Sequence, residues 1–205
     1  MATFGREKLN PTPTSDVLSK FVRVAQTSHY KVEFLGFGSP NLSRLQSYLR
    51  GKGVDQQFIT KDLGEYCNRA AVPGTRLFTK EAGDQFPGMV QKFVYKRQFE
   101  DFQMTFMVDY EYKVQKFFEL WQEFITSGSD SADGVDPTST NYYYRMRYPD
   151  QYKCDRIRLL KFDRDYNNNI EYNFMNAFPV NVATTPVDYG PSRMLEVTVS
   201  FAYDR

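Results

Sequence analysis

The amino-acid sequence predicts an α+β fold in which a mostly antiparallel β-barrel or sandwich carries one packed amphipathic α-helix. Three observations support this prediction. Turn-rich segments separate short stretches in which apolar and polar side chains alternate, the pattern of half-buried strands. The period changes to that of a helix between residues 114 and 125. The chain then ends on a regular alternation from Met194 to Arg205.

The first 20 residues predict an extended arm, because Pro, Thr, Ser and Asn dominate and no apolar period is present. We expect the first strand at residues 30–34, where apolar and charged side chains alternate. A short helix is expected at residues 41–50, where three leucines have helical spacing and two glycines follow. Residues 57–67 return to the character of a strand.

A turn is expected at Pro73–Gly74, and a flexible stretch at residues 83–88. We expect residues 89–95 and 102–108 to pair as long antiparallel strands. The amphipathic helix follows them directly. The side chains expected to pack this helix against the core are Val114, Phe117, Phe118, Trp121, Phe124 and Ile125.

After the helix, residues 126–141 predict a polar, mildly acidic loop without apolar content. The aromatic and basic stretch 142–148 is compatible with base stacking, but an anchor for protein contacts is favoured. Residues 157–162 and 170–174 predict a hairpin around a turn rich in Asp and Asn. Pro179 and Pro186 punctuate the chain before the final strand.

The final strand raises the question of assembly. A long, regular strand with nothing after it to cover its edge must pair that edge with another strand. Aromatic residues form 17% of the chain, which favours pleated surfaces and interfaces. The formal charge is +1, from 26 basic and 25 acidic side chains, and this balance argues against a surface that grips nucleic acid.

No motif predicts catalysis, a cofactor or a metal. His29 is the only histidine and lacks an evident partner for acid–base work. Cys67 and Cys154 are too few for a disulfide framework and lack metal-ligand spacing. The aspartates within residues 130–136 lack the closing glutamate of a calcium loop. A secretory signal and a membrane-length apolar run are also missing from the sequence, so we expect folding in the cytoplasm and no membrane partner.

Three segments together resemble a known family. Residues 65–74 place a cysteine ahead of a Pro–Gly pair, and residues 102–125 lead an alternating strand directly into a helix rich in Phe. Residues 176–204 combine Phe178-Pro-Val-Asn181, an Asp–Tyr turn and the final strand. In this order they resemble the tail tube proteins of contractile-tailed, T-even-like bacteriophages, and the third segment is the most specific. The resemblance extends over about residues 20–205.

The resemblance implies a structural subunit that forms homo-hexameric rings, stacked into the rigid inner tube of a contractile tail. It implies residues 21–205 as a single tail-tube domain behind the arm, with loop insertions at about 36–63 and 127–141. The implied partners are the tail sheath, baseplate and tail-terminator proteins, with tape-measure protein and DNA passing through the lumen. The implied location is the virion tail, assembled in the host cytoplasm.

A conduit for DNA must not hold it, because each neutralised phosphate adds affinity that identical rings would multiply. We therefore expect polar strand faces to line the bore, and the candidates are Gln103, Thr105, Glu196, Thr198 and Ser200. Stacking between rings is expected to use a loop over residues 76–91, with the candidates Arg76, Lys80, Phe86 and Gln91. Two alternatives remain, a baseplate tube-initiator of the same fold and a monomeric barrel that binds a ligand or acts as a small enzyme.

Overall fold

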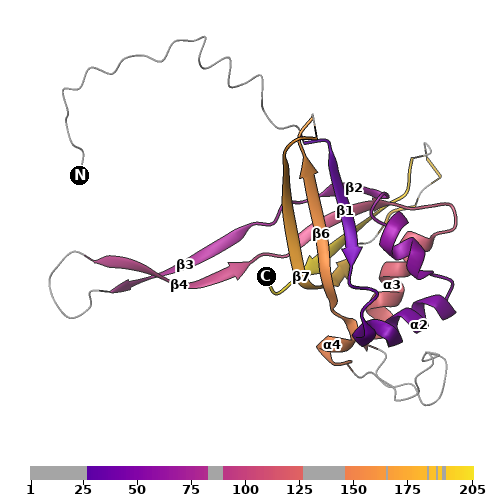
Figure 1. The fold of residues 1–205 in the computed structure, drawn as a ribbon, viewed down its shortest axis with the longest axis horizontal. Coiled ribbons are helices and arrows are strands. Elements are labelled where there is room, and N and C mark those ends of the chain that lie inside the picture. Colours follow the sequence, from indigo (N-terminus) through magenta and orange to yellow (C-terminus); the bar gives the residue numbers. More distant parts are fainter. Residues whose placement is uncertain are drawn as a thin grey trace, which may run out of the picture.

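The computed structural model describes residues 27–82, 90–126, 146–164, 166–183, 185–187, 189–190 and 193–205. Two antiparallel sheets are present in this part of the chain (Figure 1). Six strands form the larger sheet, in the order β1-β6-β7-β8-β5-β2, and β3 and β4 form a separate ribbon. The strands are β1 (Tyr30–Leu35), β2 (Cys67–Ala70), β3 (Thr75–Ala82), β4 (Gln91–Phe99), β5 (Phe102–Met107), β6 (Cys154–Phe162), β7 (Asn169–Val182) and β8 (Glu196–Ala202).

Helical segments cover one side of the larger sheet (Figure 1). They are η1 (Pro40–Leu42), α2 (Ser43–Gly51), η2 (Phe58–Asp62), α3 (Lys113–Thr126) and α4 (Pro149–Tyr152). The predicted strand at 30–34, the helix at 41–50, the amphipathic helix and the hairpin of β6 and β7 are confirmed. The predicted α+β class is confirmed as an open sandwich, because the larger sheet does not close into a barrel.

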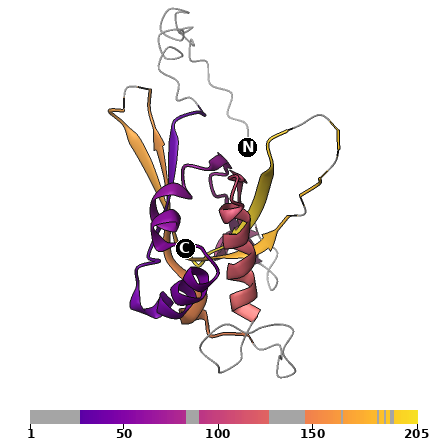
Figure 2. The same ribbon diagram turned by 90° about the vertical axis from the view of Figure 1, so that its right-hand side faces the viewer.

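Strand β7 joins the two halves of the larger sheet. Its first part pairs with β6 up to Ala177, and its last part pairs with β8 from Phe178 onward. Asn176 has a positive φ of 57°, and the register shifts between Pro179 and Asn181. Pro179 was expected to interrupt the chain, but it lies inside β7, where an irregular register tolerates its missing N–H. The sheet bends here, and α3 lies between its two halves (Figure 2).

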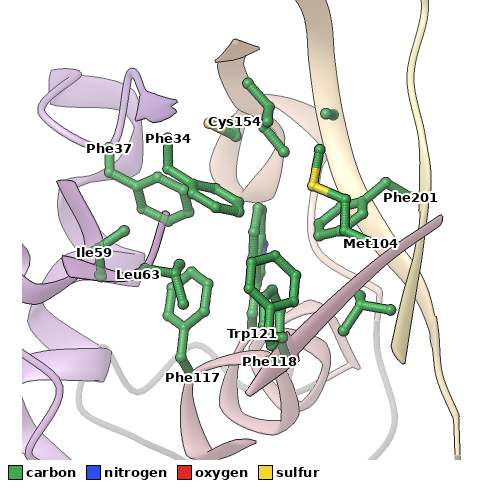
Figure 3. Close-up of a cluster of buried hydrophobic side chains, with 14 of the residues drawn as sticks. Phe34, Phe37, Ile59, Leu63, Met104, Phe117, Phe118, Trp121, Cys154 and Phe201 are labelled. Atoms are coloured by element: carbon green, nitrogen blue, oxygen red, sulfur yellow. The ribbon is translucent and has the colours of Figure 1, made fainter. Parts of the chain in front are cut away.

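The core forms where α3 meets both halves of the sheet. Figure 3 shows Phe117, Phe118 and Trp121 between side chains from opposite sides, with Phe34 and Phe201 among them. The Phe118 ring centroid lies 5.9 Å from that of Phe201, and the Phe117 ring 6.3 Å from that of Phe34. The Trp121 indole also donates a hydrogen bond of 2.9 Å to the carbonyl oxygen of Tyr152. Of the six predicted helix positions, Val114, Phe117, Phe118, Trp121 and Phe124 are buried, and Ile125 is partly buried against them.

Two predictions of strand pairing are wrong. Residues 89–95 were expected to pair with 102–108, but β4 pairs with β3, and β5 pairs with β8 and β2. The final strand was expected to have an uncovered edge, but β8 lies between β5 and β7 and is paired on both sides. Both predictions follow proximity in the sequence, whereas the strands pair according to how they pack around the core. The edge strands of the larger sheet are β1 and β2.

The strand expected within residues 57–67 is also largely wrong. Phe58–Asp62 form a wide helical turn, and only Cys67 belongs to a strand. Phe58, Ile59 and Leu63 are all buried, so this spacing directs apolar side chains to one side of a helical turn. Together with the leucines of α2, the 36–63 segment contributes to the core. The proposed arm at residues 1–20 and the 127–141 segment lie outside the described residues, and the domain boundaries stay a prediction.

Gly64 lets the two edges of the larger sheet approach each other. The Tyr30 hydroxyl on β1 donates a 2.9 Å hydrogen bond to the Cys67 carbonyl on β2. A Cβ atom at Gly64 would overlap the carbonyl oxygen of Val32, which lies in β1. The backbone at position 64 therefore packs directly against β1, and only glycine fits there without a shift of the main chain.

We predict that Gly64→Ala destabilises the fold, whereas Gly51→Ala does not. The methyl group at position 64 meets backbone, and overpacking of this kind costs about 1–3 kcal/mol. A Cβ at Gly51 meets nothing within 4 Å, and alanine there favours α2 by up to about 1 kcal/mol. The free energy of unfolding from denaturant titration of both variants checks this. Equal stability of the two variants would contradict the close packing at Gly64.

Candidate assembly surfaces

The described residues hold no arrangement suited to catalysis. Burial raises the pKa of the Cys67 and Cys154 thiols to about 12, so both are protonated and weak nucleophiles at neutral pH. His29 is exposed just before β1, and its ring lies 6.2 Å between centroids from that of Tyr166. Within the described ranges, no group of three or more His, Cys, Asp or Glu side chains could hold a metal ion. The 130–136 aspartates and Tyr142–Arg145 lie outside those ranges.

A hollow in the described part of the chain differs from the pocket of a ligand-binding barrel. A hollow of about 650 Å³ lies between η2 and the start of α3, but its lining is mostly polar and includes Arg50, Asp55, Lys61 and Lys113. Small-molecule sites are instead lined mainly by apolar and aromatic side chains. Among the helices that the structure describes, none has the length and apolar character to cross a membrane.

The structure brings the five lumen candidates onto one face of β5 and β8. Gln103 pairs in register with Ser200, and Thr105 with Thr198, while Glu196 pairs with Met107. Side chains opposite each other in an antiparallel pair project to the same face, so these residues form one polar ladder. The hydroxyl groups of Thr105 and Thr198 are 3.1 Å apart and hydrogen-bonded. The opposite face of the two strands carries the buried core residues.

The polar ladder carries few charges. Asn68, beside β5 on strand β2, donates a 2.7 Å hydrogen bond to Glu196 Oε1. Arg69 pairs in register with Thr105 and adds one cation to this face. From β7, Asn181 pairs with Ser200 and extends the polar character. A surface of hydroxyl and amide groups with one carboxylate and one guanidinium offers little net attraction to phosphates.

The second surface is the ribbon of β3 and β4. From here on we call this ribbon the arm; the name no longer refers to residues 1–20. It protrudes from the body of the molecule (Figure 1), and the side chains of all eight residues of β3 and of all nine residues of β4 are exposed or only partly buried. Apolar side chains lie on the arm nonetheless. Leu77, Phe93, Val94 and Tyr95 are between 46 and 60% exposed. An isolated two-stranded ribbon is marginally stable in water, and burial of these side chains against another surface would stabilise the arm.

The arm is also basic. Its two strands contain one carboxylate, Glu81, and five cations, and their charge of +4 contrasts with +1 for the whole chain. Three of the five cations lie over aromatic rings: Arg76 is 5.1 Å and Lys96 5.8 Å from the Phe78 centroid, and Arg97 is 4.8 Å from that of Phe99. The five cations are Arg76, Lys80, Lys92, Lys96 and Arg97.

The residues expected to stack rings lie on the arm, but in strands. Arg76 and Lys80 belong to β3 and Gln91 begins β4, whereas Phe86 lies outside the described residues. The expectation of a loop over residues 76–91 is therefore wrong in its secondary structure. The exposed apolar residues Leu77, Phe93, Val94 and Tyr95 were not predicted as contact residues. The sequence feature that could have identified them is the presence of both apolar and charged side chains on each face of β3 and β4.

The sequence matches one protein family, and the fold is similar to those of several solved structures. The family described as "Phage tail tube protein" matches residues 25–205. Among solved structures, a chain of the anti-feeding prophage baseplate is similar, with 10% identity, a TM-score of 0.53 and coverage of 89% of this chain and 93% of that chain. A chain of the anti-feeding prophage tube-terminating cap has 12% identity and a TM-score of 0.50, covering 89% and 88%. No curated protein sequence matches.

We predict that hydrogen exchange separates the arm from the sandwich in the unassembled subunit. Amides of β3 and β4 lie in an exposed ribbon, whereas those of β8 are paired on both sides over a buried core. Arm amides should exchange at least about 100-fold faster, because the ribbon opens without unfolding the core. Mass spectrometry of peptides from both regions checks this. Equal protection would mean that the arm is stable alone and needs no partner.

Proposed function

The chain belongs to the phage tail tube protein family, as a structural protein and not an enzyme, and we propose that its copies form stacked hexameric rings whose lumen conducts DNA. The single observation that carries the proposal is the arm. A ribbon with exposed apolar side chains on both faces is suited to lie between other copies of the subunit. The six-fold symmetry described for the anti-feeding prophage baseplate supports six copies in each ring.

Within a ring, we propose that the open edge of β2 pairs with a neighbouring copy. Among the described residues, β2 pairs with β5 alone, which leaves its other edge without a strand. Edge strands expose unpaired N–H and C=O groups, and closing a ring of subunits satisfies them. The segment at Gly64 packs against the other edge strand, β1, and the Tyr30 hydroxyl already bonds the Cys67 carbonyl of β2, so the proposed pairing uses the rest of the β2 edge.

The polar ladder of β5 and β8 faces the lumen in this proposal. Its hydroxyl and amide groups let DNA and a tape-measure protein pass without strong binding. Sheath, baseplate and terminator proteins then contact the outer and end surfaces of the tube. The protein is a component of the virion tail, assembled in the host cytoplasm.

The first test uses the arm. The double variant Leu77→Ser, Val94→Ser removes apolar side chains that are exposed in the subunit, so folding stability should change by less than about 0.5 kcal/mol. If each side chain contributes about 1 kcal/mol to an interface, the concentration needed for assembly should rise at least about 10-fold. Electron microscopy and light scattering measure the rings and tubes formed.

The control is Met146→Ser, an apolar residue away from the arm that is 69% exposed. It should assemble at the concentration of the unmodified protein. Two results would contradict the proposed function. One is the formation of normal tubes by the arm variant, and the other is an unmodified protein that stays monomeric under all conditions.

The second test places a cation on the polar ladder. In phage particles, Thr105→Lys and Glu196→Lys should each slow DNA ejection at low salt, because the first adds six positive charges to every ring of six and the second changes its charge by twelve. Raising the salt concentration should restore the rate. Ser47→Lys, on the exposed side of α2, is the control and should leave ejection unchanged. Ejection rates that do not respond to either ladder lysine would exclude this face from the lumen.

A further inference from the structure

The arm leaves the body of the molecule through two short connections, residues 71–74 and 100–101. Short connections of this kind can act as hinges, so they alone leave the direction of a ribbon open. We propose that residues 203–205, which we call the strap, fix the direction of the arm. Tyr203 holds Phe99, the last residue of β4, and Asp204 holds the strap on the bend of β7. This inference concerns the single subunit and goes beyond the proposed function without depending on it.

The contact between the strap and the arm is aromatic. The ring centroids of Tyr203 and Phe99 are 5.6 Å apart, with 51° between the ring planes. Phe99 is partly buried, whereas the other residues of β4 are exposed. The partly buried residue of β3, Phe78, is instead covered by Arg76 and Lys96 of the arm itself. In Figure 1 the C-terminus lies beside the end of the arm that contains Phe99, so this ring contact joins the arm to the body.

Tyr203 packs on the core of the sandwich. Its ring meets two buried rings edge-on, at 5.5 Å from the Phe102 centroid and 5.1 Å from that of Phe174. Burial raises the pKa of Tyr203, and within the described part of the chain its buried hydroxyl has no hydrogen-bond partner. The ring of Tyr203, and not its hydroxyl, therefore makes the contact with the arm.

The strap crosses the bend of β7. The Asp204 N–H donates a 3.0 Å hydrogen bond to the Met175 carbonyl, and the Met175 N–H donates one of 2.9 Å to the Arg205 carbonyl. Met175 lies in the part of β7 that pairs with β6, whereas β8 pairs with β7 from Phe178 onward. The backbone of β8 and the strap is therefore hydrogen-bonded to β7 on both sides of the bend, and Asn176 lies between these two regions.

The side chain of Asp204 joins the strap to two further elements. Its carboxylate accepts a hydrogen bond of 2.8 Å from Asn176 Nδ2, and bonds of 3.0 and 3.2 Å from Lys153 Nζ. Asn176 has its positive φ at the bend itself, and Lys153 lies between α4 and β6. The hydrogen bonds from Asn176 and Lys153 lower the pKa of Asp204, so the carboxylate is charged at neutral pH. Charge-assisted hydrogen bonds are stronger than neutral ones, which favours a fixed position of the strap.

A fixed direction matters for a ribbon with exposed apolar side chains. A surface that is already held in its bound orientation loses less freedom when a partner binds. The strap belongs to the body, and it contacts the arm within the same subunit. The arm is therefore oriented before any partner is present.

The test measures the direction of the arm with spin labels on Lys52→Cys and Gln91→Cys. Both positions are exposed, at the end of α2 and at the start of β4, and the buried thiols of Cys67 and Cys154 do not compete for the label. Pulsed electron paramagnetic resonance, on protein diluted below the concentration at which it assembles, should give one narrow distance distribution. Adding Phe99→Ala should broaden this distribution at least about 2-fold, because the connections then act as free hinges.

The matched control is Tyr203→Phe, which keeps the ring and removes the hydroxyl without a partner, and its distribution should stay narrow. Asp204→Asn and Lys153→Met should each broaden the distribution, because the strap loses its ion pair. Asp150→Asn, at an exposed aspartate of α4, should leave it unchanged. Circular dichroism confirms that each variant is folded.

Three results would overturn the proposal. The first is a broad distribution in the protein that carries only the two labels. The second is a narrow distribution with Phe99→Ala, because the connections alone would then fix the arm. The third is an effect of Phe99→Ala without any effect of Asp204→Asn, because the strap would then not depend on the bend. These measurements are made on single subunits, so their failure is separate from that of the proposed function, which the assembly of the Leu77 and Val94 variant tests.

Discussion

The packing of α3 against a bent sheet determines which face of the larger sheet is buried and which is left to solvent. Phe117 contacts Phe34 of β1 and Phe118 contacts Phe201 of β8, so one helix binds both halves of the sheet. The inner faces of β5 and β8 are buried in this contact, and their outer faces are polar. Truncation of a buried aromatic side chain of this size costs about 3–5 kcal/mol, which is a large part of the stability of a typical domain. The polar ladder of β5 and β8 exists because the core requires the opposite face.

The arm lies outside this arrangement, and its chemistry differs accordingly. Among the described helices none covers the ribbon of β3 and β4, so the ribbon has no buried face, yet it retains Leu77, Phe93, Val94 and Tyr95. A monomeric protein gains nothing from holding apolar side chains in water on a marginal ribbon. A subunit that repeats along a tube gains an interface. The sandwich thus provides the stability of the subunit, and the exposed arm provides a surface suited to contacts between subunits.

The sequence predicted the elements whose patterns are local. Helix α3 has one apolar stripe, and β8 has strict alternation, so both follow from the side chains alone. Because β5 and β8 are neighbours, the five polar candidates for the lumen meet on one face. Strand pairing was not predictable in the same way, since the partner of β5 is set by the packing of α3 and not by proximity in the chain. The helical turn at residues 58–62 and strand β3 were also not predicted. The turn has an unusual helical period, and both faces of β3 carry apolar and polar side chains.

The central claim is that the arm of each copy is buried against another copy in the assembled tube. A cryo-electron microscopy map of tubes formed by the purified protein tests it most directly. The account predicts continuous density between β3–β4 of one subunit and the surface of a neighbour, with Leu77 and Val94 out of solvent and the ladder of β5 and β8 lining the bore. A map in which the arms extend freely into solvent would contradict it.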